Sequence, residues 1–345
     1  MVVKDHEVPL NLLSAISIYL RLSELYPNLQ SVYNEILTYY SGYKGELALD
    51  YYLKFIDQKS RSILHSLRLP FINTFYQIDT LLLSANFFLM IEVKNLTGHI
   101  RFNHEKGRMY QQTEFEEKSY QDPLLQSNTH LHQFKSFLHN RGLGHVPVES
   151  LIVFVNQNAR LSDDRDDSII YGFQLMQKFE EILKKYPNST ISQTAIKQLQ
   201  SALIKLNTPL HSNMLKQLGI MPNELLYGVI CPTCMKLPMQ RPFGTWLCPH
   251  CKNSDPKAHM RAFIEYTLLF SQFITNRQAR KLLRLDSPDI IQKLFKKANF
   301  PHQGENRHRK YELNFNLQKE GLFLLNDFLK LKNNNSSEDT DILLD

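Results

Sequence analysis

Two apolar runs on either side of a short turn, in the stretch QIDTLLLSANFFLMIEVKN (residues 77–95), restrict the possible folds of this chain more than any other feature. Leu81–Leu83 and Phe87–Ile91 are apolar enough to be strands in the middle of a core. The same strands nevertheless carry three charged residues, and charged side chains are almost never fully buried unless they are paired or bind a metal. The stretch therefore predicts a core hairpin whose charged end needs a partner.

One register of this hairpin brings the three charged side chains together. Side chains alternate between the two faces of a strand, so Glu92 and Lys94 point to the same face. If Leu83 pairs with Phe88, then Asp79 lies directly opposite Glu92 and shares its face. The register is an assumption, because a slip of one residue would break the arrangement.

Two carboxylates this close repel each other unless a cation lies between them. Hard divalent cations such as Mg²⁺ are held by one or two carboxylates and by water, and such an ion activates an attacking water beside a phosphodiester. Lys94, two residues beyond Glu92, could orient that water or stabilise developing charge. The spacing indicates a phosphodiester hydrolase site. The alternative is a surface hairpin with an ordinary ion-pair cluster, which does not explain the long apolar runs.

Helices are expected before the hairpin. Residues 8–42 have helical periodicity with a break at residues 26–28, and another helix is expected after Gly45. The chain has only 12 glycines, which also favours helix. The expected apolar stripe of the helix after Gly45 consists of Leu47, Tyr51 and Phe55.

Strands and a helix are expected after the hairpin. Residues 94–103 are a candidate third strand. A helix is expected over residues 122–142, with Pro123 near its start and Gly142 after its end, and a strand over residues 148–161. The order helix, hairpin, strand, helix, strand implies an α/β core.

The hairpin and its surroundings also resemble a known family. The pattern D-x12-E-x-K, from Asp79 to Lys94, resembles the PD-(D/E)xK nuclease signature, with Ile78 in place of the signature proline. The sequence around the hairpin resembles the nuclease-related domain called NERD over roughly residues 42–160. The resemblance lies in the segments GELALDYYL … QIDTLLL … FFLMIEVKNLTGHI … DPLLQ. The resemblance implies a restriction-endonuclease-like core, which is a mixed sheet flanked by helices.

The resemblance implies a role for each charged residue of the hairpin. Asp79 and Glu92 would be ligands of a catalytic Mg²⁺ or Mn²⁺ ion, and Lys94 would be the catalytic lysine. Glu46, from the first core helix, would touch the metal directly or through water. The alternative for Glu46 is an exposed glutamate at a helix start, placed there for the helix dipole.

The helix after Pro123 would contribute to the same site. Gln126 would bind the DNA backbone or join the active-site network. His130 lies one turn further on the same face. The sequence favours a solvated surface histidine over a functional one at this position.

The four cysteines form two CxxC pairs within CPTCMKLPMQRPFGTWLCPHC. This separation can place four thiolates around one Zn²⁺ ion, as in a zinc ribbon with a turn at GTW. A site with four cysteine ligands leaves no coordination position for His250 or His259. Because the module is poor in apolar residues, it is expected to need the metal to fold. The expected zinc ligands are Cys231, Cys234, Cys248 and Cys251.

The segment after the cysteines resembles a helix-turn-helix. Thr275 can cap a helix over residues 277–283, and Ser287 can begin a second, recognition helix that ends at Lys297. A small core is expected from Ala279, Leu282, Leu283, Ile291 and Leu294. The basic residues expected to bind phosphate are Arg277, Arg280, Lys281, Arg284, Lys293, Lys296, Lys297, Arg307, Arg309 and Lys310.

The concentration of positive charge favours DNA binding by this segment, in which NRHRKYEL would form a basic wing. The alternative is a solvated helical pair that holds the C-terminus together. The net charge of the whole chain, +6, permits a nucleic-acid partner without requiring one.

The sequence predicts a cytoplasmic location. The cysteines have metal-ligand spacing and not the pattern of a disulfide framework. The N-terminus begins with the mixed charges of Lys4–Glu7, unlike a secretory signal. No run of 18 or more apolar residues occurs, so no membrane span is expected.

These features predict a metal-dependent nuclease that cleaves DNA and is brought to it by the zinc ribbon and the basic segment. One alternative is a DNA-binding adaptor or regulator whose nuclease-like fold no longer cuts, and another is a protein-interaction scaffold. The expected segments are N-terminal helices (1–41), the nuclease-like core (42–160), a helical region (161–227), the zinc ribbon (228–256), the basic helix-turn-helix-like segment (257–332) and a disordered tail (333–345).

Overall fold

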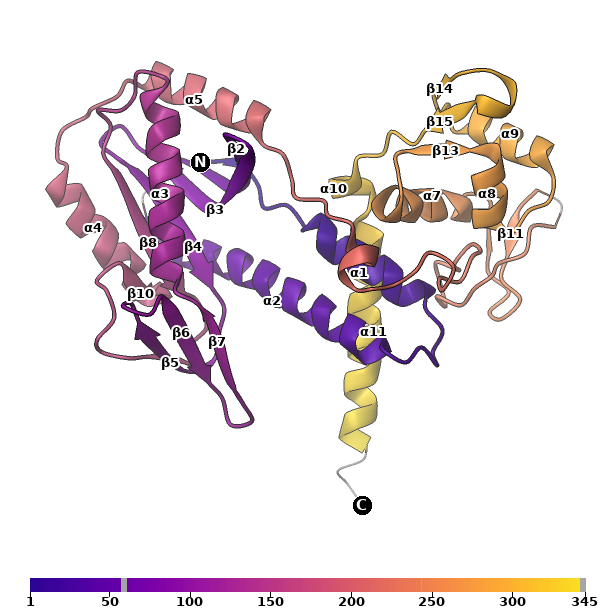
Figure 1. Ribbon diagram of the computed structural model, residues 1–345, viewed down its shortest axis with the longest axis horizontal. Coiled ribbons are helices and arrows are strands. Elements are labelled where there is room, and N and C mark those ends of the chain that lie inside the picture. Colours follow the sequence, from indigo (N-terminus) through magenta and orange to yellow (C-terminus); the bar gives the residue numbers. More distant parts are fainter. Residues whose placement is uncertain (57–60, 243, 342–345) are drawn as a thin grey trace. The chain divides into compact units, whose positions relative to one another are not determined.

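The computed structural model describes residues 1–56, 61–242 and 244–341, with the side chains of Arg307 and of residues 334–341 outside the description. The chain forms two compact units (Figure 1). The first contains residues 1–7 and 40–209, and the second residues 8–39 and 210–345. Each unit thus combines an N-terminal segment with a later one, whereas the expected segments followed one another along the chain.

A six-stranded mixed sheet forms the centre of the first unit. Its strands are β1 (Val2–Lys4), β2 (Ser62–Phe71), β3 (Thr74–Leu83), β4 (Phe88–Lys94), β8 (Val148–Phe154) and β10 (Ile169–Tyr171), in the order β1-β2-β3-β4-β8-β10. β2, β3 and β4 are antiparallel neighbours, while β1, β8 and β10 each run parallel to a neighbour. The α/β class expected from the sequence is confirmed.

The charged hairpin consists of β3 and β4, and its register is the expected one. Leu83 pairs with Phe88, and the ladder continues to Thr80 and Ile91. β4 pairs with β8 on its other side, so it is an interior strand of the sheet. An interior strand with both faces covered carries a long apolar run, which explains the stretch from Phe88 to Ile91.

Helices cover both faces of this sheet (Figure 1). They are α3 (Pro123–His139), α4 (Leu175–Lys185), α5 (Gln193–Leu206) and the C-terminal part of α2 (Leu29–Leu53). Phe134 of α3 and Leu199 of α5 share one core with Met90 of β4. Leu49 of α2 shares the other core with Ile91, the next residue of β4. Alternate residues of the strand therefore enter opposite cores.

α2 is one continuous helix, although the sequence predicted separate helices on either side of Gly42. A glycine inside a helix weakens it without ending it. Gly45 also has a packing role, because a Cβ atom at this position would lie 2.6 Å from the Cβ of Asn95. The helix can therefore approach the end of β4 closely, and this places Glu46 beside the sheet.

The apolar stripe predicted for this helix is wrong. Leu47, Tyr51 and Phe55 are 39%, 59% and 56% exposed, whereas Leu49 and Leu53 are buried. The helix carries apolar residues on more than one side. Periodicity alone therefore could not decide which side faces the sheet.

A second, four-stranded sheet of the first unit has the order β7-β6-β5-β9. Residues 94–103, expected to extend the hairpin, instead supply β5 to this sheet, because the chain turns at Gly98 with a φ of 81°. The strand expected over residues 148–161 is split into β8 and β9. The strands of this sheet are β5 (Gly98–Asn103), β6 (Arg108–Gln112), β7 (Glu117–Gln121) and β9 (Ala159–Leu161).

The second unit contains the expected helix-turn-helix and a small sheet of order β13-β15-β14. Thr275 caps α8 in a capping box with Gln278, and Ser287 caps α9. The five residues expected in the small core are all buried. The elements are α7 (Ala258–Leu269), β13 (Phe273–Thr275), α8 (Asn276–Leu283), α9 (Pro288–Lys297), β14 (His302–Gln303) and β15 (Lys310–Glu312). The pairing of β14 with β15 places a wing beyond the second helix.

The cysteine segment shares one hydrophobic core with this helix-turn-helix. Trp246 and Cys248 belong to the same buried cluster as Phe263 of α7 and Phe295 of α9. The last residue of the GTW stretch, Trp246, begins β11 (Trp246–Leu247), which pairs with β12 (Ser254–Asp255). The ribbon is therefore packed onto the helices and is not an isolated module.

The long helix α11 (Leu322–Asp341) packs beside α1 (Leu10–Arg21) in the second unit. Its backbone is helical to Asp341, within the segment 333–345 for which the sequence predicted disorder; residues 342–345 lie outside the described part. The short helices α6 (Met214–Gln217) and α10 (Leu317–Glu320) complete this unit. None of the described helices is both long and apolar enough to cross a membrane.

A buried network of four charged residues connects α1, α7 and α11. Glu265, which is fully buried, accepts hydrogen bonds from Arg21 Nε at 2.6 Å and from Arg261 Nε at 2.9 Å. Arg261 also pairs with Asp327 of α11 at 2.6 Å. The two guanidinium groups and the two carboxylates balance in charge, as burial requires.

Replacing Glu265 by alanine is expected to lower the free energy of unfolding of the second unit by about 3–5 kcal/mol, because two buried guanidinium groups lose their shared partner. Thermal or urea unfolding would measure the loss. Glu24→Ala is the matched control, since Glu24 forms an exposed ion pair with Lys236 in the same unit. Equal stability of the two variants would show that the network does not hold these helices together.

Candidate active site

β3 loses its regular pairing on both sides at Asp79. Ser66, which faces this position from β2, has a φ of 50° and so leaves the strand conformation. The Asp79 carboxylate instead accepts hydrogen bonds from the backbone N–H of Val93 at 2.8 Å and from Gln77 Nε2 at 3.3 Å. Asp79 is 8% exposed. The sheet thus opens at this point and holds one carboxylate in the gap.

Glu92 and Lys94 at the end of β4 form an ion pair that reaches α3. Lys94 Nζ donates to Glu92 Oε1 at 2.8 Å and to Gln126 Oε1 at 3.3 Å. His130 Nδ1 lies 4.0 Å from Glu92 Oε2, and the His130 side chain is only 17% exposed. The interpretation of His130 as a solvated surface residue is therefore wrong. α3 presents both Gln126 and His130 to the hairpin because they are one turn apart.

α2 contributes Glu46 to the same region. Ser66 Oγ donates to Glu46 Oε2 at 2.9 Å, and the Glu46 side chain is 14% exposed. Glu46 lies inside α2, not at its start, so its interpretation as an exposed residue placed for the helix dipole is wrong. Its position next to Ser66 puts it close enough to Asp79 to act on the charge of that residue.

Crowding of negative charge perturbs the central carboxylate. Burial, and then the charges of Glu92 and Glu46, raise the pKa of Asp79 well above its ordinary value. The Val93 N–H and the Lys94 ammonium group act in the opposite direction and do not cancel the effect. At Asp79 the two neighbouring carboxylates outweigh the one ammonium group of Lys94, and this local excess of negative charge favours a bound cation.

The donor set fits a hard divalent ion held partly by water. In the described part of the chain, two clusters bring ligand atoms of three or more His, Cys, Asp or Glu residues within 4.8 Å of one another, and the carboxylates of Glu46, Asp79 and Glu92 are not one of them. Mg²⁺ and Mn²⁺ need no such compact cage, since one or two carboxylates and several waters suffice. Asp79 and Glu92 are the two carboxylates that the hairpin brings together.

Asp79→Asn is expected to stabilise the protein in buffer without added divalent metal, by about 1 kcal/mol. Because the folded-state pKa of Asp79 is raised, its ionised form destabilises the fold, and stability is lost as pH rises through that pKa. The gain in melting temperature should therefore be larger at pH 8 than at pH 5. A variant less stable than the wild type at pH 8 would contradict this account of the site.

The four cysteines form a compact cluster that could hold a metal ion. Their Sγ atoms lie within 4.8 Å of one another, with Cys231 and Cys251 at 3.6 Å and Cys234 and Cys248 at 3.5 Å. Thiolates around a tetrahedral Zn²⁺ at about 2.3 Å are about 3.8 Å apart, so this set fits zinc. His259 is separate from the cluster and accepts a hydrogen bond from Trp246 Nε1 at 3.1 Å.

The basic residues of the helix-turn-helix are largely accessible. Arg277, Lys281, Lys293, Lys296, Lys297 and Lys310 are exposed, Arg280 and Arg309 are partly buried, and the side chain of Arg307 lies outside the described residues. Arg280 donates to the carbonyl oxygen of Asp286 at 3.2 Å, and Lys281 lies over the ring of Tyr227. Within the described chain, neither Lys296 nor Lys297 has an ion-pair partner. These two lysines of α9 are available for an anionic ligand.

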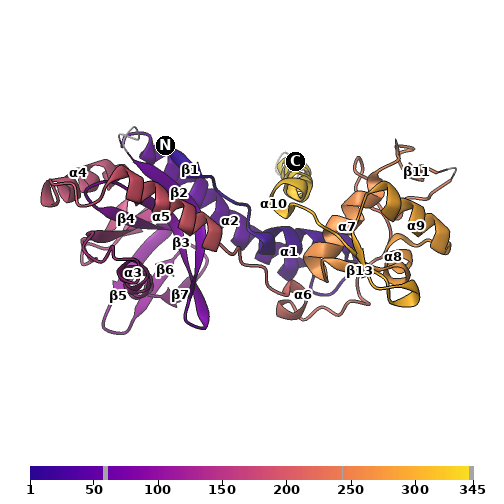
Figure 2. The ribbon, with the colours of Figure 1, turned by 90° about the horizontal axis from the view of Figure 1, so that it is seen from above.

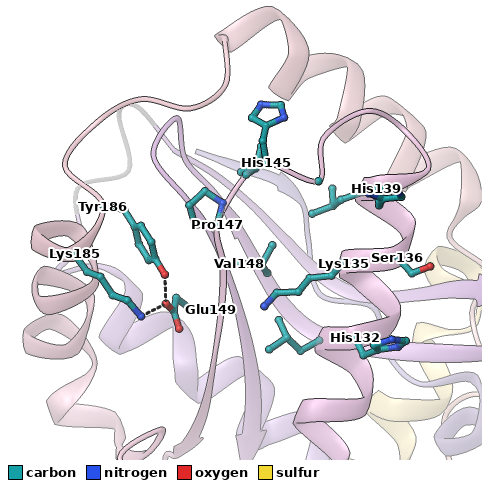
Figure 3. A pocket seen from close by; sticks show the side chains of 14 residues that line it. His132, Lys135, Ser136, His139, His145, Pro147, Val148, Glu149, Lys185 and Tyr186 are labelled. Carbon is teal, nitrogen blue, oxygen red and sulfur yellow. Dashed lines mark hydrogen bonds and ion pairs between the residues drawn. The ribbon is translucent and has the colours of Figure 1, made fainter.

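An open hollow of about 740 Å³ lies elsewhere in the first unit (Figure 3). It is bordered by α3, by the start of β8 and by the end of α4. Glu149 within it accepts hydrogen bonds from Lys185 Nζ at 2.8 Å and from the Tyr186 hydroxyl at 2.7 Å. None of the residues expected at the catalytic site lines this hollow, so it is not where the carboxylates gather.

Sequence reasoning missed Ser66 and the neighbouring histidines. His6 and His65 lie beside Glu46 and Asp50, yet His6 is near the N-terminus and His65 is in β2, a strand that was not expected. Two weak signals were present. Asp50 follows Glu46 by four residues on one helix, and His65 interrupts the alternating apolar positions of its strand.

Residues 41–155 match the family model of the nuclease-related domain, NERD. The range agrees with the resemblance noted over residues 42–160, and it contains every residue expected at the catalytic site. Comparisons with curated proteins and with solved structures give no significant match. This segment of the first unit is therefore similar to a nuclease-related domain.

Proposed function

We propose that this protein is a metal-dependent nuclease of the PD-(D/E)xK type that hydrolyses DNA phosphodiester bonds. The observation that carries the proposal is the convergence of Asp79, Glu92 and Lys94 where the sheet opens, within the segment that matches the nuclease-related domain. The excess negative charge around Asp79 supports a role for a cation in this site.

Asp79 and Glu92 would hold Mg²⁺ or Mn²⁺, with Glu46 binding directly or through water. Such an ion polarises a phosphodiester and lowers the pKa of a coordinated water. The backbone N–H of Val93 keeps one Asp79 oxygen fixed at 2.8 Å, so the carboxylate is oriented before any ligand arrives. Fixed orientation of this kind reduces the reorganisation needed during reaction.

Lys94 would assist the attacking water and stabilise charge that develops on the phosphate. Its ammonium group is already held between Glu92 Oε1 and Gln126 Oε1, at 2.8 Å and 3.3 Å. Gln126 thereby acts as a positioning residue in the active-site network. His130 borders the same carboxylate and is a further candidate for contact with substrate.

The second unit would bind the DNA. A helix-turn-helix places its second helix in the major groove, and a wing can contact the neighbouring backbone. Here α9 would be the recognition helix, with Lys293, Lys296 and Lys297 exposed along it. Arg309, just before β15, and Lys310, its first residue, would lie in the wing. The zinc-bound cysteines would maintain this surface through the shared core. Thiolate ligands of this kind fit the reducing cytoplasm.

Reversing Lys296 and Lys297 to glutamate is expected to weaken DNA binding strongly at moderate salt. Each lost phosphate contact should also flatten the dependence of log affinity on log salt by about 0.9 for duplex DNA. Fluorescence anisotropy over a range of salt concentrations would measure both effects. Charge reversal is preferable to deleting the chain after residue 225, because deletion would uncover the buried residues Leu12 and Leu13 of α1.

The matched control reverses two exposed lysines of the first unit, Lys184 of α4 and Lys205 of α5. It changes the net charge equally without altering the helix-turn-helix. If both double variants lose the same affinity and slope, binding reflects total charge only. The scaffold interpretation of the C-terminal segment would then be the better one.

A cleavage assay tests the catalytic proposal directly. Purified protein should cut linear, circular or single-stranded DNA with Mg²⁺ or Mn²⁺ and not with EDTA. The second candidate function is a DNA-binding adaptor that does not cut. Salt-sensitive DNA binding without cleavage of any of these substrates would favour it.

A further inference from the structure

A second cluster of metal-type ligands lies in the first unit, outside the residues assigned to catalysis. His6 follows β1, Asp50 is on α2 and His65 is on β2, and one ligand atom of each lies within 4.8 Å of the others. Figure 2 shows β1, β2 and α2 as neighbours. Asp50 Oδ1 is 3.0 Å from His6 Nε2 and 3.7 Å from His65 Nε2. Three segments that are distant in sequence therefore direct their donor atoms to one point.

These separations suit a shared metal ion. Ligand atoms bound at about 2.0–2.1 Å around a tetrahedral ion are about 3.3 Å apart, which lies between the two measured distances. The imidazole rings of His6 and His65 stack with centroids 3.7 Å apart and 21° between their planes, and their Nε2 atoms lie 3.0 Å and 3.7 Å from Asp50 Oδ1. Because an imidazole binds a metal in its own plane, the two rings would tilt apart for both Nε2 atoms to coordinate one ion. A simple hydrogen bond between His6 and Asp50 would not require His65 to approach the same oxygen.

The other nitrogen of each histidine faces an oxygen, as is usual for metal-bound imidazoles. His65 Nδ1 is 2.9 Å from Thr80 Oγ1. His6 Nδ1 is 3.9 Å from Glu46 Oε2, and it is buried without a hydrogen-bond partner. These neighbours would orient the rings so that Nε2 is the free donor in both.

The histidines of the cluster are shielded from solvent, whereas Asp50 is accessible to it. The side chains of His6 and His65 are 7% and 2% exposed, whereas that of Asp50 is 45% exposed. An ion could therefore enter from solvent at Asp50 and keep a water ligand there. The nearby Lys4 ammonium group pairs with Glu7 and donates to the backbone carbonyl of His65, so its charge is partly compensated.

We propose that His6, Asp50 and His65 form a binding site for a borderline divalent metal of the Zn²⁺ type, with water completing the coordination. Two imidazoles and one carboxylate suit Zn²⁺, Co²⁺ or Mn²⁺, whereas Mg²⁺ strongly prefers oxygen ligands. The ion would attach the N-terminal segment to α2 and β2. Through His6 it would also restrain Glu46, so the site would support the carboxylate cluster without belonging to it.

The test is zinc uptake by the full-length protein with its cysteine site already loaded and Mg²⁺ in excess to occupy carboxylate-only sites. Isothermal titration with Zn²⁺ should reveal one further equivalent per chain. Asp50→Asn should lower the affinity for this further zinc ion at least about 10-fold, since one of three protein ligands loses its charge. This variant changes a surface side chain without changing its shape, so it should fold. His65→Asn should have the same effect, and added zinc should raise the melting temperature of the wild type but not of these two variants.

Two controls define the site. His132→Asn removes an exposed histidine of α3 and should keep the further equivalent. Glu92→Gln alters the carboxylate cluster and should keep it as well, which separates this site from the proposed catalytic one. The proposal is overturned if the wild type takes up no further zinc, or if Asp50→Asn takes up zinc as tightly as the wild type. A further equivalent that is lost in Glu92→Gln would also overturn it.

Discussion

Glu92→Gln is expected to reduce divalent-dependent DNA cleavage by about 10²–10⁴-fold, the contribution of a single catalytic or charge-stabilising group. The substitution keeps the shape of the side chain and removes its charge, so the proposed ligand of the cation and the charged partner of Lys94 are lost together. Asp79→Asn and Lys94→Gln should have effects of similar size. Initial rates with Mg²⁺ and with Mn²⁺ would be compared at equal enzyme concentration.

The control is Glu149→Gln, the same substitution in the neighbouring strand β8. Glu149 faces the hollow and pairs with Lys185, so cleavage should remain within about twofold of the wild type. DNA affinity should be unchanged in Glu92→Gln, because the proposed binding surface lies in the second unit. Wild-type rates in Glu92→Gln and Asp79→Asn would end the nuclease proposal as placed here.

Removal of zinc from the cysteine cluster is expected to unfold the ribbon and to disorder the helix-turn-helix with it. Structural zinc contributes about 10–16 kcal/mol of apparent binding free energy in small zinc modules. Because Trp246 and Phe295 belong to one core, loss of the ribbon should spread to α9. Trp246 is the single tryptophan of the chain and is buried, so its fluorescence reports on this region alone. A zinc-selective chelator should shift its emission to the red and abolish tight DNA binding.

Cys248→Ser should reproduce the effect of the chelator, and elemental analysis should show that it lacks the tightly held zinc ion. The first unit shares no ligand with the cysteines, so slow cleavage at high enzyme concentration should survive the treatment. A Trp246 signal that does not respond to chelation, in protein shown to be free of zinc, would refute a structural role for the metal.

Features that depend on a few neighbouring residues could be predicted from the sequence. The register assumed for the hairpin, with Leu83 paired to Phe88, is the one observed as far as Thr80 and Ile91. Thr275 and Ser287 marked the starts of α8 and α9, because capping satisfies backbone N–H groups within the same turn. The clustering of the four cysteines was also predictable, because the spacing of the CxxC pairs limits where their four thiolates can meet.

Features that depend on distant segments could not be predicted. The sequence did not show that residues 1–7 join the first unit while residues 8–39 join the second. It also favoured the wrong side of α2, because the helix has apolar residues on more than one side and only the sheet selects between them. The assignment of β5 to a separate sheet is a choice of the same kind.

The sequence by itself determined the charged hairpin, the helix caps and the cysteine cluster, since local geometry and chemistry decide them. Only the tertiary structure decided what surrounds these elements. It placed the partly buried His130 beside Glu92, and it brought His6 and His65 to one carboxylate of α2. The physical reason is that many alternative pairings of apolar surfaces bury similar areas and so differ little in free energy. Which pairing forms depends on the whole chain, whereas a register or a cap depends on a few adjacent residues.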